Sequence, residues 1–357
     1  MKHTVLITGA SGYVGAMLAA QFAERDDVER VVGLDKEDGP DPIARHPKVV
    51  HIKANTADAW EAQARTYAPD IVVHAAWQIR EMYGRQNIEW HWNVDGSDKV
   101  FDFVFGEKSV RRLIYFSTVA SYGAFEDNTI EHHFVESEPF RKSRYLYAEE
   151  KRIVEEHLAE RYQRAHTAGS SVVVSIVRPA AVTGPRGRFM RIRFGLQAAL
   201  AGQLKGSFAY DLVSSLVSFV PVTKKWCRQF IHEDDVVDIV ALLSFSEVSH
   251  QYEVFNISPP GEVVRGIDMA RAVGKRLLPV PPWLIRIAFF CMWHLTRGKI
   301  PTGAGAWRSY SYPITVDGSK LTSMYGFAYS TSSFDAFYYT KGRYEDSIPP
   351  AQRRHKS

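Results

Sequence analysis

The sequence predicts an α/β fold in which helices cover both faces of a parallel sheet, followed by a smaller C-terminal lobe. Short apolar runs alternate with segments of helical period through the first half of the chain, which is the pattern of βα units. A glycine-rich turn joins the first apolar run to the first helical segment. After about residue 183 the alternation stops and prolines and aromatics become frequent, which indicates a lobe of different construction.

The elements follow in order along the chain. The first strand is expected at residues 5–8, before a helix in which Val14, Leu18 and Phe22 recur at helical spacing. Further short apolar runs predict strands at residues 31–35, 49–53, 71–75, 113–117 and 172–178. Helical segments between them are expected at residues 58–67, 88–105 and 144–165. A later helix at 233–245 and a strand at 252–257 indicate that the chain returns to the sheet.

Composition and charge exclude several classes of protein. The 357 residues include 44 Lys and Arg and 40 Asp and Glu, so the formal net charge of +4 does not predict a nucleic-acid partner. The two cysteines, Cys227 and Cys291, cannot build a disulfide framework or supply a structural zinc site, so no metal is expected. A reduced cytoplasm is the expected location, and no transmembrane segment is expected.

Residues 8–15 read TGASGYVG and place Gly9, Gly12 and Gly15 between the first strand and the first helix. Glycines permit a tight turn and a close backbone approach, and the free N–H groups of a helix N-terminus attract phosphate. The position directly after the first strand is the context in which this pattern binds a dinucleotide. The turn therefore predicts a pyrophosphate site.

An acidic residue ends the second strand. Asp35 follows Gly15 by 20 residues, where a carboxylate can accept both ribose hydroxyls of NAD and repel the 2′-phosphate of NADP. Lys36 softens that repulsion, and NAD is predicted in preference to NADP. Asn55, after the third strand, is expected to contact the adenine.

Tyr147 and Lys151 form a Y-x-x-x-K pair within the predicted helix 144–165. A spacing of four places both side chains on one helix face. An ammonium group and a cationic nicotinamide nearby should make the tyrosine easier to ionise than its reference pKa of about 10 implies, so that it can move a proton. Thr118 follows the fifth strand, at the sheet edge where open parallel sheets bind ligands, and its hydroxyl can bond the same substrate oxygen.

With these motifs the chain resembles the extended short-chain dehydrogenase/reductases, also called the NAD-dependent epimerase/dehydratase family. The resemblance covers residues 4–257 and fades afterwards, although residues 316–327 (VDGSKLTSMYGF) resemble the closing segment of the family. Besides the turn and Asp35, the matching motifs are HAA at 74–76, Asn93, FSTVASYG at 116–123, YAEEK at 147–151 and RPAAVTGP at 178–185.

The resemblance implies a Rossmann-type NAD-binding domain over residues 1–182, to which residues 226–258 return, and a substrate-binding lobe over 183–225 and 259–340. The polar and basic residues 341–357 predict a mobile tail. Thr118, Tyr147 and Lys151 are the implied catalytic set. The implied cofactor contacts are Gly9, Ser11, Gly12, Tyr13, Val14, Gly15, Asp35, Lys36, Asn55, Thr56, His74, Ala75, Ala76, Asn93, Ser117, Tyr147, Lys151, Pro179, Ala181 and Val182.

Candidate substrate contacts lie after the fourth, fifth and sixth strands. They are Trp77, Gln78, Arg80, Ser121, Arg186 and Arg188. Family 4,6-dehydratases carry an Asp-Glu pair after the catalytic threonine, but Val119 and Ala120 stand there in this chain. Sugar dehydration is therefore disfavoured.

Three functions are compatible with these residues. The favoured one is a nucleotide-sugar epimerase-like enzyme, because basic residues such as Arg186, Arg188 and Arg308 suit a diphosphate. The second is a dehydrogenase or reductase of a hydrophobic alcohol or ketone, of the sterol- or flavonol-reductase kind. The third is a non-catalytic NAD-binding assembly module, against which the intact catalytic set argues. A homodimer is expected, because helices 88–105 and 144–165 carry extra apolar residues, including Phe101, Phe105 and Ile153.

Residues 283–295 (WLIRIAFFCMWHL) are apolar around nearly the whole circumference of a predicted helix. The stretch is too short to span a bilayer. We expect it to be buried in the substrate lobe, where it would make one wall of the pocket apolar; the alternative is peripheral contact with a membrane surface.

Overall fold

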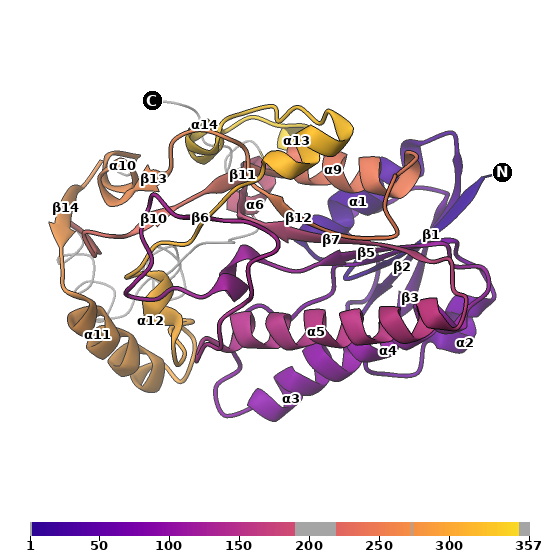
Figure 1. The fold of residues 1–357 in the computed structure, drawn as a ribbon, viewed down its shortest axis with the longest axis horizontal. Helices are drawn as coiled ribbons and strands as arrows, with labels where there is room; N and C mark the ends of the chain where they lie inside the picture. Colours follow the sequence, from indigo (N-terminus) through magenta and orange to yellow (C-terminus); the bar gives the residue numbers. More distant parts are fainter. Residues whose placement is uncertain (1, 190–218, 273, 350–357) are drawn as a thin grey trace.

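The computed structural model describes residues 2–189, 219–272 and 274–349, and its centre is a seven-stranded sheet (Figure 1). The strands lie in the order β12-β7-β5-β4-β1-β2-β3 and every neighbouring pair is parallel. This arrangement confirms the predicted α/β fold with a doubly wound parallel sheet. The strands are β1 (His3–Thr8), β2 (Val28–Asp35), β3 (Val49–Lys53), β4 (Ile71–His74), β5 (Arg112–Phe116), β7 (Val173–Pro179) and β12 (Tyr252–Ile257).

Helices cover both faces of the sheet and form two apolar cores. One face carries α1 (Tyr13–Glu24) and α9 (Glu233–Phe245), and the other carries α4 (Gly96–Gly106) and α5 (Leu146–Thr167) (Figure 1). In β1, Val5 and Ile7 enter the first core while Leu6 enters the second, as the two-residue period of a strand requires. Burial on both sides explains why these strands read as unbroken apolar runs.

Two predicted helices differ from the structure. The helix expected at 88–105 is divided into α3 (Gln86–Trp90), a π-helical turn η2 (His91–Asp95) and α4. The helix expected at 58–67 is reduced to α2 (Glu61–Arg65). Its first turn is replaced by a local turn in which the Asn55 N–H donates to Asp58 Oδ2 at 3.1 Å. Such side-chain acceptors compete with the helical hydrogen bonds of their own segment.

The order of the strands reverses between β1 and β4, which are neighbours in the sheet. At such a point the loops after the two strands diverge to opposite faces and leave a crevice at the carboxyl edge. The glycine turn follows β1, and residues 75–77 follow β4. The short helix η3 (Val119–Tyr122) follows β5, and β8 (Ala181–Thr183) follows β7.

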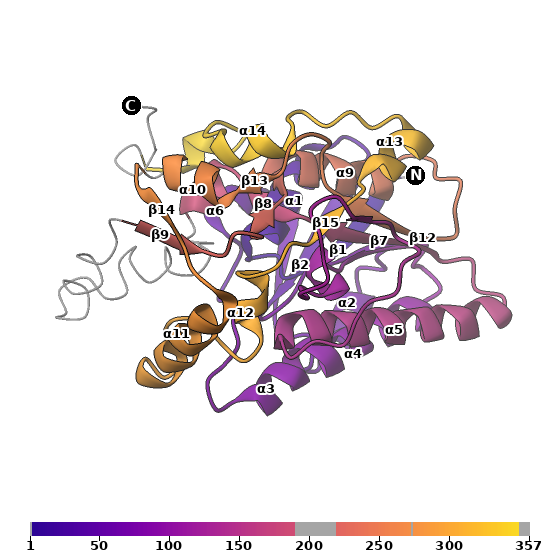
Figure 2. The ribbon, with the colours of Figure 1, turned by 60° about the vertical axis from the view of Figure 1, so that its left-hand side comes forward.

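A group of small elements lies beyond the carboxyl ends of the strands (Figures 1 and 2). It contains two short strand pairs, parallel β9–β14 and antiparallel β10–β13, with three helices. Their bounds are β9 (Phe219–Val222), β10 (Cys227–Arg228), β13 (Val264–Arg265), α10 (Gly266–Ala272), β14 (Arg276–Pro279), α11 (Pro282–Leu295) and α12 (Ala306–Ser309). The division into a cofactor domain and a substrate lobe stays a prediction.

The remaining short elements connect this group to the sheet. They are η1 (Pro42–Ala44), β6 (His133–Phe134), α6 (Pro185–Phe189), β11 (Phe230–His232), β15 (Thr315–Val316), α13 (Ser319–Tyr325), α14 (Ser333–Tyr338) and η5 (Glu345–Ser347). Two of them pair with distant partners: β15 with β6, and β11 with β8.

The segment predicted as a mobile tail is packed where the structure describes it. Arg343 Nη1 lies 2.9 Å from Asp238 Oδ1 on α9, and the Tyr344 hydroxyl donates to the carbonyl of Met17 at 3.1 Å. Tyr344 and Ile348 are buried. Residues 341–349 therefore belong to the folded body, and the rest of the predicted tail, 350–357, lies outside the described residues.

The predicted burial of residues 283–295 is wrong. They form α11, but only Ile285, Phe289 and Trp293 are buried along it. These three side chains recur every fourth residue and so form a single stripe. Ile285 and Phe289 pack with Ala306 of α12, together with half-buried neighbours such as Tyr145 and Tyr310. Most of the other apolar side chains of α11 are exposed.

Candidate active site

The glycine turn presents free backbone N–H groups at the crevice. Gly9 has a φ of +72°, a backbone conformation that residues with a side chain rarely adopt. A Cβ at Gly15 would lie 2.0 Å from the Gly9 carbonyl oxygen. Gly12 caps α1 without a side-chain hydrogen bond. The first N–H groups of α1 therefore remain available for an anion, and the close packing that only glycine allows brings the helix end near it. The turn fits the diphosphate of a dinucleotide.

Asp35 ends β2 beside this turn. Its Oδ2 accepts the Ser11 N–H at 2.9 Å and its Oδ1 accepts the Glu37 N–H at 3.1 Å. An ionised carboxylate has about four acceptor positions, so capacity remains for ribose hydroxyls. Lys36 turns to Glu37 at 2.6 Å instead of toward Asp35. Asn55 uses its side-chain oxygen to accept the Ala57 N–H at 3.0 Å, which shapes the loop after β3.

Tyr13 and Arg186 are held by carboxylates of the chain itself. The Tyr13 hydroxyl donates to Glu233, which also accepts the backbone N–H groups of Arg186 and Gly187 at 3.0 Å each. The Arg186 guanidinium, only 3% exposed, pairs with Asp41 at 2.6 Å. Its predicted contact with a substrate phosphate therefore gains no support from its position. The side chain of Arg188 lies outside what the structure describes.

Three further predicted contacts hold neighbouring loops in place. His74 is buried between the hydroxyls of Thr8 at 2.7 Å and Ser97 at 2.8 Å, and burial lowers its pKa to about 3, so its ring is neutral. The Ser121 hydroxyl donates to the carbonyl of Ala148 at 3.0 Å, which ties η3 to α5. Both side chains act by positioning the crevice rather than by facing it. Thr56 is buried too, with its hydroxyl 3.4 Å from the carbonyl of Trp92.

Asn93 lies in the π-helical turn and fixes the loop after β4. Its Oδ1 accepts the Gln78 N–H at 2.7 Å, and its Nδ2 donates to the Gln78 carbonyl at 3.0 Å. The Gln78 side chain in turn donates to the Arg80 carbonyl at 2.9 Å. The substrate candidates Trp77, Gln78 and Arg80 therefore stand on a loop whose shape Asn93 sets. A π-turn of this kind commonly marks a functional position.

Thr118, Tyr147 and Lys151 come together at the crevice. The Thr118 side chain lies beside that of Tyr147, and Thr118 Oγ1 accepts the Ala120 N–H at 3.2 Å. Lys151 Nζ is buried, donates to the Phe116 carbonyl and lies 3.6 Å from the centre of the Trp77 ring. The ring of Trp77 also meets that of Tyr147 edge-on, with centroids 6.5 Å apart. The predicted catalytic residues thus lie at one place, between β4, β5 and α5.

The electrostatics of this set differ from the expectation of an easily ionised tyrosine. Burial raises the pKa of Tyr147, and the neighbouring Thr118 hydroxyl only partly offsets that rise. Burial also lowers the pKa of Lys151 well below its usual value, against the opposing influence of Glu155 and Glu150. The physical reason is that Lys151 turns its ammonium to the Phe116 carbonyl and the Trp77 ring. In the protein alone, Tyr147 therefore holds its proton.

Two buried polar groups of this region have no hydrogen-bond partner within the described residues. They are Ser117 Oγ, at the end of β5, and Trp77 Nε1, in the loop after β4. Leaving such groups unpaired costs about 1–3 kcal/mol each, so they are expected to be satisfied by a bound molecule or by water. This observation fits a site that takes a polar ligand, such as the dinucleotide that the glycine turn suits.

A pair of buried carboxyls beside the set was not predicted from the sequence. Glu150 accepts the Asn93 amide at 2.7 Å, and Glu89 accepts the Met82 N–H at 2.7 Å. Each keeps one oxygen without a partner among the described residues. Burial raises the pKa of both carboxyls to about 7. The sequence feature that could have indicated Glu150 was its position directly before Lys151, on the inward face of α5.

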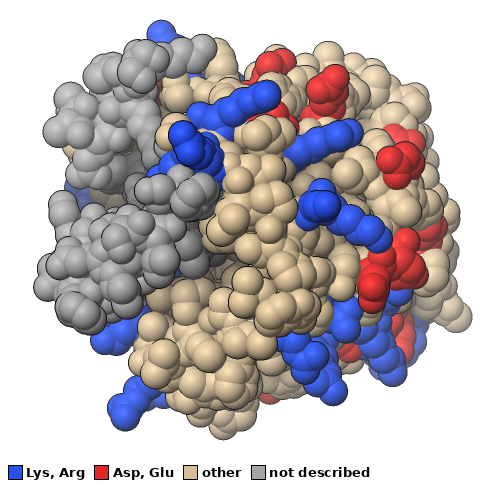
Figure 3. All heavy atoms as spheres, turned by 90° about the vertical axis from the view of Figure 1, so that its left-hand side faces the viewer, with Lys and Arg blue, Asp and Glu red and all other residues tan. Residues whose placement is uncertain are grey.

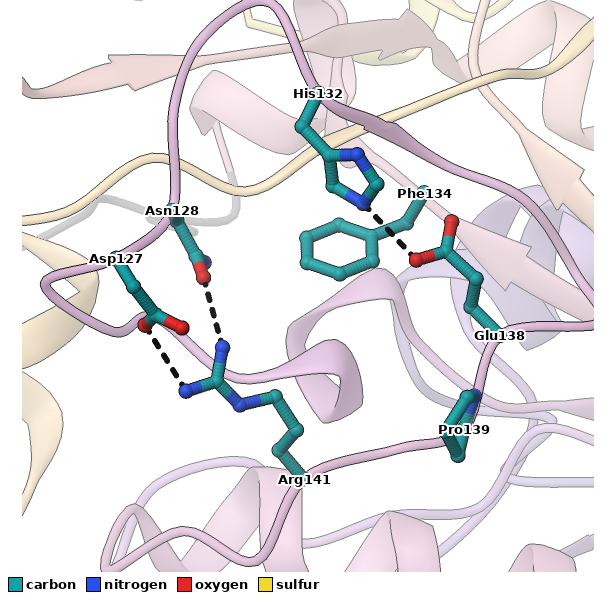
Figure 4. Close-up of a pocket in the computed structure, with 7 residues that line it drawn as sticks. All are labelled: Asp127, Asn128, His132, Phe134, Glu138, Pro139 and Arg141. Atoms are coloured by element: carbon teal, nitrogen blue, oxygen red, sulfur yellow. Dashed lines mark hydrogen bonds and ion pairs between the residues drawn. The ribbon is translucent and has the colours of Figure 1, made fainter.

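A separate small pocket lies near β6 (Figure 4). Its polar side chains already bind one another: Arg141 pairs with Asp127 at 3.0 Å, and His132 with Glu138 at 2.9 Å. None of its lining residues was a predicted contact. They are Asp127, Asn128, His132, Phe134, Glu138, Pro139 and Arg141. Because its charges are neutralised internally, this pocket is not the candidate active site.

Residues 2–189, 219–272 and 274–349 contain neither a metal-binding group nor a membrane-spanning helix. No three His, Cys, Asp or Glu side chains in those ranges lie close enough to hold an ion. Likewise, no helix there combines the length and the apolar character needed to cross a bilayer. His232, which precedes three acids in sequence, accepts the Asp234 N–H at 3.2 Å and caps α9.

Comparisons with known proteins agree with the fold and the motifs. The model of the NAD dependent epimerase/dehydratase family matches residues 5–258. A Sinorhizobium fredii protein, "Uncharacterized protein y4nG", is 26% identical over 297 residues, a match that spans 78% of this chain and 63% of the length of that relative.

Solved structures with the same fold are less than 25% identical to this chain. UDP-glucose 4-epimerase of Thermus thermophilus, complexed with NAD, aligns with a TM-score of 0.64 at 20% identity over 94% of this chain and 99% of its own. Bordetella bronchiseptica WbmG, complexed with NAD and UDP, aligns with a TM-score of 0.66 at 21% identity over 97% and 96%. These likenesses establish a shared fold.

Proposed function

Because the chain belongs to the NAD dependent epimerase/dehydratase family, we propose that it binds NAD and epimerises a carbinol carbon of a nucleotide sugar. The observation that carries this proposal is the meeting of Thr118, Tyr147 and Lys151 at the same sheet edge as the glycine turn and Asp35. A diphosphate at the turn and a proton-transfer group on α5, beside the end of β5, suit a redox step at an alcohol carbon.

Each residue of the site has a separate role in the proposed reaction. The glycine turn and Asp35 would hold NAD, which would supply a hydride acceptor and donor for the carbinol carbon. Tyr147, once ionised beside the positive charge of oxidised NAD, would accept the hydroxyl proton at Oη as the carbonyl forms and give it back when the alcohol is restored, so no net oxidation results. Thr118, beside Tyr147, would orient the substrate oxygen. Lys151 donates to the Phe116 carbonyl and so fixes the end of β5 beside the site.

Support for the substrate class comes from the chain and from its relatives by fold. Thermotoga maritima UDP-glucose 4-epimerase, a solved structure with UDP-glucose, aligns with a TM-score of 0.66 at 17% identity over 94% of this chain and 98% of its own. Val119 and Ala120 follow Thr118 in η3 and provide no acid for expelling a sugar hydroxyl, which disfavours dehydration.

The second candidate is a net dehydrogenase or reductase of a more apolar alcohol or ketone. It is favoured by the aromatic surroundings of the reacting group, since the rings of Trp77 and Tyr145 lie 6.5 and 5.8 Å from that of Tyr147. Such rings suit a greasy substrate as well as a sugar face. A purely structural NAD-binding module would not need the Thr118–Tyr147–Lys151 set.

One experiment separates these functions. The cofactor released from purified protein on denaturation is identified, and nucleotide sugars are then screened for epimer formation without added cofactor. Retained NAD that is recycled through many turnovers supports the epimerase. Stoichiometric oxidation of NADH with an added ketone supports the reductase. Absence of both activities in a protein that retains NAD would favour the non-catalytic module.

Asp35 makes a prediction about cofactor choice. Asp35→Ala should narrow the preference for NAD over NADP by at least about tenfold, because a hydrogen bond to a charged group contributes about 1.5–3 kcal/mol and the repulsion of a 2′-phosphate disappears. Titration of both cofactors measures this. Asp38→Ala is the matched control, since Asp38 is exposed in the same loop and pairs with Lys53. An unchanged ratio would refute the role of Asp35.

We also propose the homodimer that the helices predicted, with a corrected set of residues. Phe101 lies in the core under α4, so it cannot contribute to an interface. Phe105 on α4 and Ile153 on α5 are half-buried and remain available. Light scattering at micromolar concentration should give twice the mass of the chain, and Ile153→Asp should lower it to that of one chain because a charge in an apolar contact is costly. A monomeric wild type would contradict the proposal.

A further inference from the structure

The outward face of α11 is apolar. Ile285, Phe289 and Trp293 form the stripe that packs on the body, with the Phe289 and Tyr310 rings 5.1 Å apart. The residues on the opposite side of the same helix are the ones that meet solvent. We call them the α11 face: Trp283, Leu284, Ile287, Phe290 and Leu295, which are between 40% and 84% exposed.

This face inverts the ordinary pattern of a surface helix, which is polar where it meets water. The charged residue of α11, Arg286, lies to one side, over the ring of Trp307 at 5.8 Å. His294 is the polar side chain on the exposed side, and its Nδ1 is 3.1 Å from the Tyr83 hydroxyl. A contiguous exposed apolar surface of this kind marks a binding surface.

The apolar surface continues onto the elements that precede α11. Leu278 on β14 and Ile267 on α10 are 44% and 39% exposed. The views in Figures 1 and 2 agree that α10, β14 and α11 lie together at the same end of the molecule. Several exposed apolar side chains therefore share one end of the protein.

In the stretch of chain that contains β14 and α11, the charged residues have one sign. Between residues 269 and 316 the chain has seven Lys and Arg and no Asp or Glu. Among them Arg276, Arg286, Arg297 and Lys299 are exposed. Figure 3 views this end of the molecule: red and blue spheres both lie along the top and right, and blue spheres border the lower tan surface. The α11 face is thus apolar in the centre and basic at the rim.

We propose that the α11 face binds the surface of an anionic lipid bilayer. The apolar side chains would enter the boundary between headgroups and acyl chains, and the surrounding Arg and Lys side chains would meet anionic headgroups. With 14 residues, α11 is too short to cross the bilayer, so it would lie in the plane of the interface. This binding would hold the carboxyl-edge crevice close to the membrane, because α11 lies beyond the carboxyl ends of the strands (Figure 1).

The charge distribution favours this occupant over a second copy of the chain. In a closed symmetric dimer the same patch faces itself. The basic rims of the two copies would then oppose each other without acids from residues 269–316 to balance them. An anionic bilayer surface would instead attract the basic side chains of the rim. That attraction must weaken as salt is added.

The test is sedimentation of the full chain with vesicles. Wild-type protein should pellet with phosphatidylcholine vesicles that contain about 30% phosphatidylserine, and pelleting should fall with added salt and with pure phosphatidylcholine. The double variant Ile287→Glu, Phe290→Glu should bind at least about tenfold more weakly, because it places charge in the apolar centre. Val135→Glu, Met324→Glu is the matched control, since both residues are exposed, apolar and outside the basic stretch.

The outcomes decide the proposal. Circular dichroism must show that both double variants remain folded. Wild-type protein that stays in the supernatant with the anionic vesicles would overturn the proposal, as would an equal loss of binding in the control variant. A wild-type dimer that the α11 variant converts to a monomer would assign the face to a second copy instead.

Discussion

Tyr147→Phe is expected to lower the turnover number of the enzyme about a thousandfold, since it removes only the hydroxyl that exchanges a proton with the substrate. That hydroxyl lies beside Thr118, just after the end of β5. The ring remains, so its edge-on packing with Trp77 and the position of α5 should be kept. NAD retained on purification should therefore be unchanged. The measurements are kcat on the substrate identified by screening and the amount of cofactor bound.

Tyr145→Phe is the matched control. Its ring lies 5.8 Å from that of Tyr147, just before α5, and its hydroxyl has no role in the proposed proton transfer. It should change turnover by no more than a few fold. If Tyr147→Phe kept wild-type turnover, or if both variants lost it equally, Tyr147 would not be the proton-transfer group.

The free energy of unfolding is expected to fall as pH rises from about 5 to about 8. Burial raises the pKa of Glu89 and of Glu150 to about 7 in the folded protein, from an ordinary value of 4.5. Over this interval the folded chain holds protons that the unfolded chain has released, so deprotonation favours unfolding. One such carboxyl lowers the free energy of unfolding over this interval by on the order of 3 kcal/mol, because each unit of pKa difference corresponds to about 1.4 kcal/mol. Urea unfolding across the pH range measures the slope.

Two substitutions test whether Glu89 and Glu150 cause this dependence of stability on pH. Glu150→Gln and Glu89→Gln keep the size of the side chain and remove its charge, so each should flatten the dependence of stability on pH and raise stability at about pH 8. Glu160→Gln, which changes an exposed residue of the same helix, is the control. A slope that survives both buried substitutions would mean that other groups titrate in this range.

Much of the fold follows from local patterns that the chain carries in its sequence. The strand at Val49–Lys53, the strand at Tyr252–Ile257 and the helix at Glu233–Phe245 have the bounds that periodicity predicts. Strands buried on both faces must be apolar throughout, and this constraint is visible without a structure. Helix ends were less predictable, because the Asn55–Asp58 turn and the π-turn at His91–Asp95 depend on side-chain contacts.

The candidate site, too, could be predicted from the sequence only in part. The glycine turn and the Tyr147–Lys151 pair are set by spacing along a turn and a helix, and the structure brings both to the sheet edge with Thr118. Which predicted residues face the crevice was not visible in the sequence. Arg186 is committed to Asp41, which is 145 positions away in the chain. His74 and Ser121 are committed to neighbouring loops.

The sequence by itself determined the class of fold, the glycine turn and the spacing of the catalytic set, because each of these depends on residues that are close together along the chain. Only the tertiary structure decided the electrostatics of the site and the surface of α11. The pKa values near 7 of Glu89 and Glu150 arise from desolvation by distant segments. An apolar helix can be buried on all sides or on one. On α11 the buried stripe is Ile285, Phe289 and Trp293. Burial is a property of what surrounds a residue, and that is settled only when the chain is folded.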